Sequence, residues 1–208
     1  METLPNECLL EIFNNLRAYH KSLFSCLLVN RFWCRIIVPI LWSEPGAHFN
    51  DKRLVKICLL ALNAEEQALL IPFNIILPKK QINLLFEYTK YITSVDYDYL
   101  TQGIEKYYNN SIDDRCVDYI IIRAVKCSLA LMFLRSSEGL NYLNFVGNIY
   151  NEIIFIEKLR KNTSITSLRL SNSHLKDKTL DDIFNKSVNL ISLKLSGNQL
   201  TPKMEEKL

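Results

Sequence analysis

The sequence predicts a mixed fold: an all-α N-terminal unit, then a helical connector, then an α/β unit built from repeats. Three observations lead to this prediction. Residues 1–45 contain three short segments with apolar side chains at helical spacing. Residues 46–91 continue with helical patterns interrupted by prolines. Residues 140–208 carry a self-similar pattern that recurs every 25 residues, which indicates a repeat architecture.

The first helix is predicted in the stretch LPNECLLEIFNNL, residues 4–16. Pro5 stands where proline favours a helix start, because its backbone angle is already helical. The apolar residues then follow i, i+3, i+4 and i+7 and form one stripe: Leu9, Ile12, Phe13 and Leu16. Leu10 lies about 100° away from Leu9 around the helix, so the apolar surface is wider than one stripe.

Two further helices are predicted over residues 22–30 and 31–38, the second ending before Pro39, because a helix rarely continues through proline. A unit this small buries only about 60 % of its surface and is marginal alone. The cysteines supply no metal-binding spacing to stabilise it. Its apolar side therefore packs either on the rest of the chain or on a second protein.

The N-terminal segment carries three motifs: Leu4-Pro5 at the start, the segment Val29-Asn30-Arg31-Phe32-Trp33, and the closing Leu41-Trp42. On these motifs, residues 3–42 resemble an F-box. The resemblance implies binding to the adaptor Skp1 and, through it, to a cullin–RING ubiquitin ligase, with no catalysis by this chain. The implied adaptor face comprises Leu4, Pro5, Leu9, Ile12, Leu16, Val29, Trp33 and Leu41. Phe13, Leu27 and Ile36 are assigned to the internal core of the three helices.

The C-terminal part contains three windows of the form L-x-x-L-x-L-x-x-N-x-L, which start at Leu140, Ile165 and Leu190. They resemble leucine-rich repeats, which implies a short, right-handed α/β solenoid with one strand and one helix per repeat. Asparagine at the ninth position would bond the backbone of a neighbouring turn. The middle repeat has Ser173 there, so a looser turn is expected at this point.

Alternate strand positions should point outward, because side chains in a strand alternate between the two faces. The outward row at the fifth position contains Asn144, Arg169 and Lys194, with Tyr142 beside it at the third position. Two interpretations stay open: an ordinary solvated face, or a recognition surface for an acidic segment of a protein substrate.

The middle of the chain is assigned to a helical connector over residues 46–91, including a helix over Gln81–Tyr91. Residues 92–139 are assigned to degenerate early repeats, with a repeat-like strand in Ile92–Tyr97 and an apolar helix within Asp118–Leu134. No capping repeat follows the third window, so the chain is expected to be a truncated solenoid or to have its last strand covered.

Composition excludes several function classes. The net charge of +3 is too small to indicate nucleic-acid binding. No secretory signal is seen, and the most apolar run, Tyr119–Leu134, is too short and too charged for a membrane span. No catalytic, metal-binding or phosphate-binding motif is found, so neither enzymatic activity nor a cofactor or metal is expected. Cysteines among apolar residues indicate buried, reduced thiols, and therefore a protein of the cytoplasm, the nucleus or both.

The sequence therefore predicts a non-catalytic substrate receptor of a Skp1–cullin–F-box ligase, which holds a protein substrate on its repeats. The alternative is a leucine-rich-repeat scaffold whose N-terminal helices cap the solenoid and have no link to a ligase.

Overall fold

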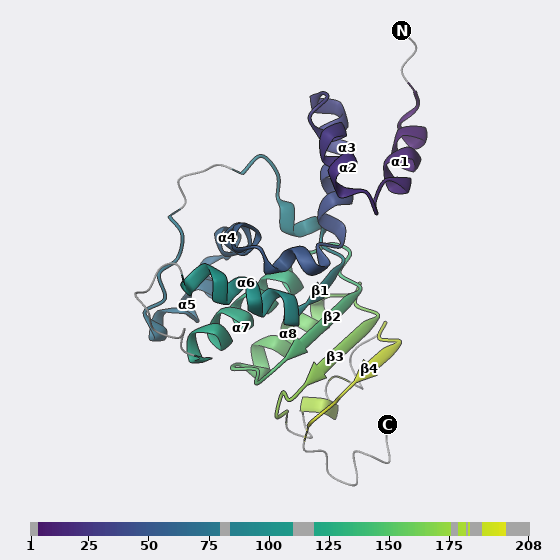
Figure 1. Cartoon of the computed structure of the whole chain (residues 1–208). Coiled ribbons are helices and arrows are strands. Elements are labelled where there is room, and N and C mark those ends of the chain that lie inside the picture. The colour runs from purple at the N-terminus through teal and green to yellow at the C-terminus, as the bar shows by residue number, and fades with distance from the viewer. Residues whose placement is uncertain are drawn as a thin grey trace.

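The computed structural model describes residues 4–79, 84–109, 119–175, 179–181, 183 and 189–198. A unit of three helices projects from one end of an α/β body (Figure 1). The two parts have separate hydrophobic cores. None of the described helices is both long and apolar enough to cross a bilayer.

The N-terminal unit consists of α1 (Asn6–Asn15), α2 (His20–Leu27) and α3 (Arg31–Ser43). The Asn30 side chain caps α3 by accepting a hydrogen bond from the Trp33 N–H at 2.8 Å. All three helices contribute to one small core, whose buried members are Leu9, Phe13, Leu23, Ile37 and Ile40.

Helix α3 does not end before Pro39, contrary to the prediction, but continues to Ser43. Proline inside a helix costs about 3 kcal/mol, because it lacks the N–H and its ring crowds the preceding turn. The continuation buries Ile40 in the N-terminal core and stacks Trp42 on Tyr88, with 4.7 Å between ring centroids. Burying side chains of this size contributes about 2 kcal/mol each, which offsets the cost of the proline.

The connector contains α4 (Lys52–Leu60), α5 (Ala64–Ala68) and three 3-10 turns, η1 (Gly46–Asn50), η2 (Ile71–Phe73) and η3 (Tyr88–Tyr91). The helix predicted over Gln81–Tyr91 is absent from its described part, which is irregular over residues 84–87; residues 80–83 lie outside the described residues. Leu84 and Leu85 remain exposed there. A short helix needs tertiary packing to be stable, and these leucines find none.

The body contains a four-stranded parallel sheet whose strands follow sequence order. Strand β1 (Ser94–Asp96) is followed by α6 (Tyr97–Asn109) and α7 (Tyr119–Ser136). Then come β2 (Tyr142–Val146), α8 (Glu152–Lys161), β3 (Ser167–Ser171) and β4 (Ser192–Lys194). Helix α8 lies behind the strands in the view of Figure 1.

Strand pairing follows the period read from the sequence. Tyr142 pairs with Ser167, and Ser167 with Ser192, so each step is 25 residues. Ser94 pairs with Tyr142, so the strand predicted within Ile92–Tyr97 does join the sheet. The α/β prediction is thus confirmed as a small parallel sheet, while its classification as a leucine-rich-repeat solenoid stays a prediction. Residues 92–139 are more regular than expected, with two long helices after the strand.

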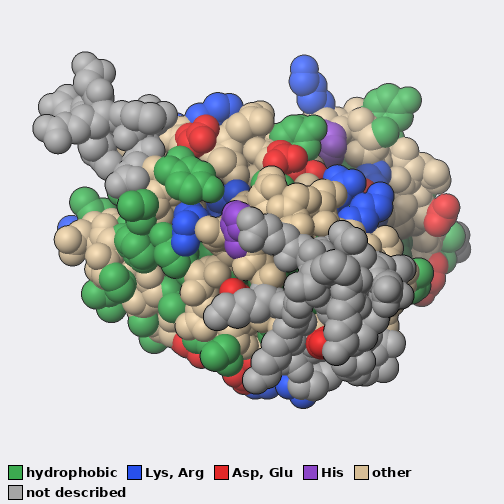
Figure 2. Space-filling view, turned by 90° about the horizontal axis from the view of Figure 1, so that it is seen from below, with side chains coloured by type: hydrophobic (Ala, Val, Ile, Leu, Met, Phe, Trp, Pro, Cys, Tyr) green, Lys and Arg blue, Asp and Glu red, His purple; other side chains and the backbone are tan. Residues whose placement is uncertain are grey.

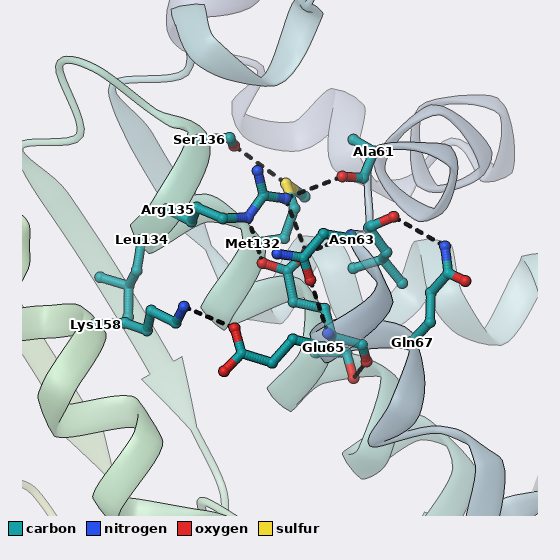
Figure 3. Close-up of polar contacts among 12 residues, drawn as sticks. Ala61, Asn63, Glu65, Gln67, Met132, Leu134, Arg135, Ser136 and Lys158 are labelled. Atoms are coloured by element: carbon teal, nitrogen blue, oxygen red, sulfur yellow. Dashed lines mark hydrogen bonds and ion pairs between the residues drawn. The ribbon is translucent and has the colours of Figure 1, made fainter.

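A buried ion pair fastens the connector to α7 (Figure 3). Glu66 is only 1 % exposed, and its carboxylate accepts two hydrogen bonds from the Arg135 guanidinium, at 2.7 and 2.9 Å. It also accepts the Asn63 N–H at 2.9 Å, while the Asn63 side chain accepts the Glu66 N–H and caps α5. Ser128 on α7 donates to the Glu66 carbonyl at 3.1 Å. These bonds satisfy a charge that burial would otherwise make costly.

The turns after the strands repeat one backbone feature. Gly147, Asn172 and Gly197 occupy the same repeat position, and all three have positive φ, of 104°, 51° and 67°. Glycine and asparagine tolerate this left-handed region better than other residues. The next residue, Asn198, accepts the N–H groups of Ser173 and His174 and donates to the Leu170 carbonyl at 2.8 Å.

The turn at Ser173 is therefore held by Asn198 and is not looser, contrary to the prediction. A side chain at the ninth position bonds the turn one repeat earlier, so Ser173 affects the turn after β2. The Ser173 hydroxyl donates instead to the Ser171 carbonyl in its own turn, at 3.4 Å. The expected truncation after the third repeat depends on residues 199–208, which lie outside the described residues.

Candidate protein-binding surfaces

The structure divides the predicted adaptor face into three classes of exposure. Leu4, Pro5, Ile12 and Val29 are exposed, with Ile12 at 45 % and Val29 at 59 %. Leu16, Trp33 and Leu41 are half-buried against the small core. The exposed members lie at the start of α1, on α1, and in the link between α2 and α3, so they are available to a partner.

The prediction that Leu9 belongs to the adaptor face is wrong, because Leu9 is only 5 % exposed and lies in the core of the three helices. Phe13, one turn further along α1, is also buried and meets Trp33 edge to face, with 5.1 Å between centroids. The stripe read from the sequence thus faces inward at Leu9 and Phe13. Ile12 lies on the exposed side of α1, whereas Leu9 and Phe13 face the core of the three helices.

Five further large apolar side chains of the same unit are exposed beyond the predicted set: Leu10, Tyr19, Phe24, Leu28 and Phe32. Helical spacing gives a signal for three of them, because Phe24 and Leu28 are four residues apart and Phe32 stands four residues before Ile36. The angular offset of Leu10 from Leu9 also indicated a wider apolar surface. An apolar surface of this extent on one small unit is typical of a protein-binding site.

The N-terminal unit is fixed to the body at the end of α3. Thr93, just before β1, donates to the Ser43 carbonyl from both its N–H and its hydroxyl, at 2.7 and 2.9 Å. His20 on α2 meets His48 in the turn η1, with ring centroids 4.8 Å apart. These contacts set the direction in which the exposed apolar surface points relative to the sheet.

The outer face of the sheet is the second candidate surface. The register aligns one side chain from each strand in the order Asp96, Asn144, Arg169 and Lys194. Arg169 and the neighbouring Tyr142 are half-buried, and Lys194 is exposed. Flanking positions on β3 and β4 carry serine hydroxyls, so this part of the face combines two cations with small hydrogen-bonding groups.

Asn144 corrects the predicted substrate-binding set, because it is only 2 % exposed and offers little contact area to a partner. Its side chain is short, and its row neighbours Asp96 and Arg169 lie on the strands on either side. Of the predicted set, the cations that reach the surface are Arg169 and Lys194. On the lower side of the molecule, shown in Figure 2, the described basic and acidic side chains are interspersed.

Of the five cysteines that the structure describes, two are buried, Cys26 and Cys34 are half-buried, and one is exposed. Cys58 and Cys127 are buried, and burial raises the pKa of the Cys58 thiol to about 12, which keeps it protonated. Cys8 on α1 is exposed, contrary to the prediction of buried thiols. No cluster of metal-ligating side chains is found in the described part of the chain.

Comparison with known protein families gives a match at the N-terminus. Residues 1–47 match the F-box-like family, which covers the three N-terminal helices and the start of η1. This match indicates a role in Skp1 binding within Skp1–cullin–F-box complexes. No curated protein and no solved structure matches the chain.

Proposed function

We propose that this chain is a substrate-recognition subunit of a Skp1–cullin–F-box ubiquitin ligase. One observation carries the proposal: a unit matching the F-box-like family has a small core of its own and leaves a broad apolar surface uncovered. Burying apolar surface contributes roughly 25 cal/mol per Å², so a partner that covers this face gains affinity from it. Skp1 is the partner that the family match indicates.

The proposed role is positioning, without chemistry by this chain. A substrate held by the body would be kept near the ubiquitin-conjugating enzyme at the far end of the cullin, which raises its effective concentration. Such a role requires a fixed angle between the docking unit and the substrate-binding part. The bonds from Thr93 to Ser43 and the stacking of Trp42 on Tyr88 support this requirement. The proposed location is the cytoplasm, the nucleus or both.

The proposed substrate surface is the outer face of the sheet, taken as a short series of leucine-rich repeats. The 25-residue strand register and the bonds of Asn198 to the preceding turn support this classification. Arg169 and Lys194 would pair with carboxylates of a substrate segment, and the serines beside them would donate further hydrogen bonds.

The adaptor proposal is tested by co-expressing the full chain with Skp1 and measuring the dissociation constant of the purified pair. Ile12→Asp and Val29→Asp place a charge on the proposed interface, and each should weaken binding at least about tenfold. Ile153→Asp is the matched control, since Ile153 is an equally apolar and even more exposed residue on α8 of the body. Binding that is unchanged by both interface variants would overturn the proposal.

The substrate surface is tested with proteins captured from cells in which proteasome and cullin activity are blocked. Arg169→Glu combined with Lys194→Glu should remove proteins that bind through an acidic segment, because like charges would then face each other. Lys161→Glu, an exposed charge reversal on α8, is the control. If the double variant captures the same proteins as the control, the outer face of the sheet is not the substrate surface.

A second candidate function is a scaffold without any ligase link, in which the N-terminal helices cap the end of the sheet. The packing of α3 on the turn η3 favours this reading. A full chain that is soluble, monodisperse and unable to bind Skp1 would support the scaffold over the receptor.

A further inference from the structure

A pocket at the carboxyl end of the sheet differs in character from both surfaces described above. It is an open pocket with a volume of about 470 Å³, lined by α6, α7 and the turns that follow β2 and β3. This volume lies within the range of about 300–1,000 Å³ found for small-ligand sites. Its polar walls come from segments far apart in the sequence, among them Asp98, Arg123, Lys126, Asn148 and His174.

Three side chains from one face of α7 line the pocket: Tyr119, Arg123 and Lys126. Their spacing of i, i+4 and i+7 places them in one row along the helix. The Arg123 guanidinium stacks on the Tyr150 ring, 3.9 Å from its centroid, which fixes the plane of the guanidinium. Lys126 donates to the Val146 carbonyl at 2.6 Å, which uses only one of its three N–H groups.

Two buried polar atoms at this pocket have no hydrogen-bond partner: Nε of Arg123 and Oδ1 of Asn148. Buried polar groups in folded proteins are nearly always paired, so each exception needs an explanation such as a bound ion or ligand. Arginine can only donate, so whatever pairs with Nε must supply an acceptor atom. The Asn148 amide can present either its oxygen or, after rotation, its NH₂ group.

The charges around the pocket favour an anion. Arg123 and Lys126 provide two cationic groups on its lining, against the one carboxylate of Asp98. The pKa of Lys126 is lowered overall, because burial disfavours its charged form. The nearby Cys127, Asp98 and Glu105 partly offset this effect. A bound anion would stabilise the charged form of both cations.

The backbone on the far side of the pocket is unusual. Asn172 and His174 both have positive φ, of 51° and 49°, and both line the pocket. For histidine this conformation is uncommon, and such residues cluster at ligand-binding sites. Gly147, which also lines the pocket, has φ of 104°, a backbone conformation that residues with a side chain rarely adopt.

We propose that this pocket binds one oxyanion group, a carboxylate or a phosphate, between Arg123, Lys126 and the turns after β2 and β3. The group pairs with the Arg123 guanidinium and with the free N–H groups of Lys126, and it lies beside the Asn148 amide. Such charge-assisted bonds are the stronger ones in proteins. The inference does not rest on Skp1 binding, because none of these residues belongs to the N-terminal unit.

The test uses the three histidines as reporters, because His174 lines the pocket while His20 and His48 contact each other at the joint. The full chain is labelled with ¹³C at histidine, and the imidazole signals are assigned by His→Gln substitution. Sodium phosphate and sodium acetate are then titrated separately at constant pH and ionic strength. The expected result is a saturable shift of the His174 signal with at least one anion, while His20 and His48 stay unchanged.

Variants separate specific binding from a general salt effect. Arg123→Gln should weaken anion binding at least about tenfold, because it removes a charge-assisted hydrogen bond. Arg123→Lys should bind with intermediate strength, and Arg160→Gln on α8 should match the wild type. If Arg123→Gln does not fold, Lys126→Met serves in its place and should weaken binding in the same way.

Comparing the phosphate and acetate titrations identifies which chemical group the pocket binds. Saturation by phosphate alone indicates a phosphoryl group, and saturation by both anions indicates that a carboxylate is also accepted. Peptides with a glutamate, a phosphoserine or a free C-terminal carboxylate then show whether a polypeptide supplies the group, through tighter binding than the free anion. The proposal is overturned if His174 shows no saturable shift, if all three histidines shift together, or if the folded variant binds as the wild type does.

Discussion

The N-terminal unit and the body use their apolar residues in opposite ways. Among the described residues, the N-terminal core has five fully buried members, while the same unit exposes eight large hydrophobic side chains. The body buries 35 residues in one continuous core and exposes ten large hydrophobic side chains over a much longer stretch of chain. The body is thus organised around its interior, and the N-terminal unit around a surface that a partner would complete.

The largest loss of stability is expected when the largest buried side chain of the N-terminal unit is removed. Phe13→Ala is expected to cost about 3–5 kcal/mol, more than a unit with so small a core can lose. Helices α1, α2 and α3 should then exchange their amide hydrogens freely while α7 stays protected, as measured by hydrogen exchange and mass spectrometry. Phe24→Ala, which truncates an exposed ring in the same unit, should have little effect. Equal loss of protection in α7 would show that the two parts fold as one.

In the body, the largest loss of stability is expected from breaking the buried ion pair between Arg135 and Glu66. Arg135→Ala leaves the Glu66 carboxylate buried without its cation, and the expected loss of stability is about 3 kcal/mol. Urea unfolding followed by circular dichroism measures it. The control is Lys161→Ala, which breaks a solvent-exposed pair with Glu157 and should cost less than about 1 kcal/mol. Similar losses for the two variants would mean that the buried pair does not fasten the connector.

Asn198 should contribute less to the free energy of unfolding than the buried ion pair does, but more than a surface residue. Asn198→Ala removes the acceptor for two N–H groups of the turn after β3 and the donor to Leu170. The expected cost is about 1–2 kcal/mol, because partly buried backbone groups lose their partners. The same unfolding assay applies, with Asn189→Ala as control, since Asn189 makes one exposed bond to the Thr163 carbonyl. A cost no larger than that of the control would contradict this account of the turn.

The converse substitution, Ser173→Asn, should stabilise the body by roughly 1 kcal/mol. Asparagine at this position would reach the turn after β2 as Asn198 reaches the turn after β3, and a hydrogen bond contributes about that much. A rise of a few degrees in the melting temperature is expected from calorimetry. Ser173 is buried, so Ser173→Ala measures separately what the hydroxyl contributes. A fall in melting temperature for Ser173→Asn would show that the turns are not equivalent.

The smallest effect is expected at an exposed ion pair between the link after α1 and the end of α3. Arg17→Ala breaks an ion pair with Glu44 whose side chains are 45 % and 58 % exposed. Such pairs contribute about 0–1 kcal/mol, because solvent screens the charges. Neither unfolding nor the affinity for Skp1 should change measurably. A larger effect would mean that this pair stabilises the packing of α3 on the first two helices more than its exposure implies.

Local patterns in the sequence were enough for much of this architecture. The three N-terminal helices, the strand positions and the 25-residue register all follow from spacing along the chain, because helical and strand periodicities are local properties. The F-box resemblance also came from residues close together in sequence, and the family match covers the same region. Of the adaptor face, the sequence indicated Ile12 and Val29, which are exposed, but could not separate them from Leu9.

The tertiary structure decided which side chains are buried and which distant groups meet. Leu9 is buried and Ile12 exposed because α3 packs against only one side of α1, which spacing along α1 does not reveal. Arg135 meets Glu66 across 69 residues, and the oxyanion pocket joins α7 to turns that follow two separate strands. Burial and pairing depend on which segments come together, and that is a property of the folded chain as a whole.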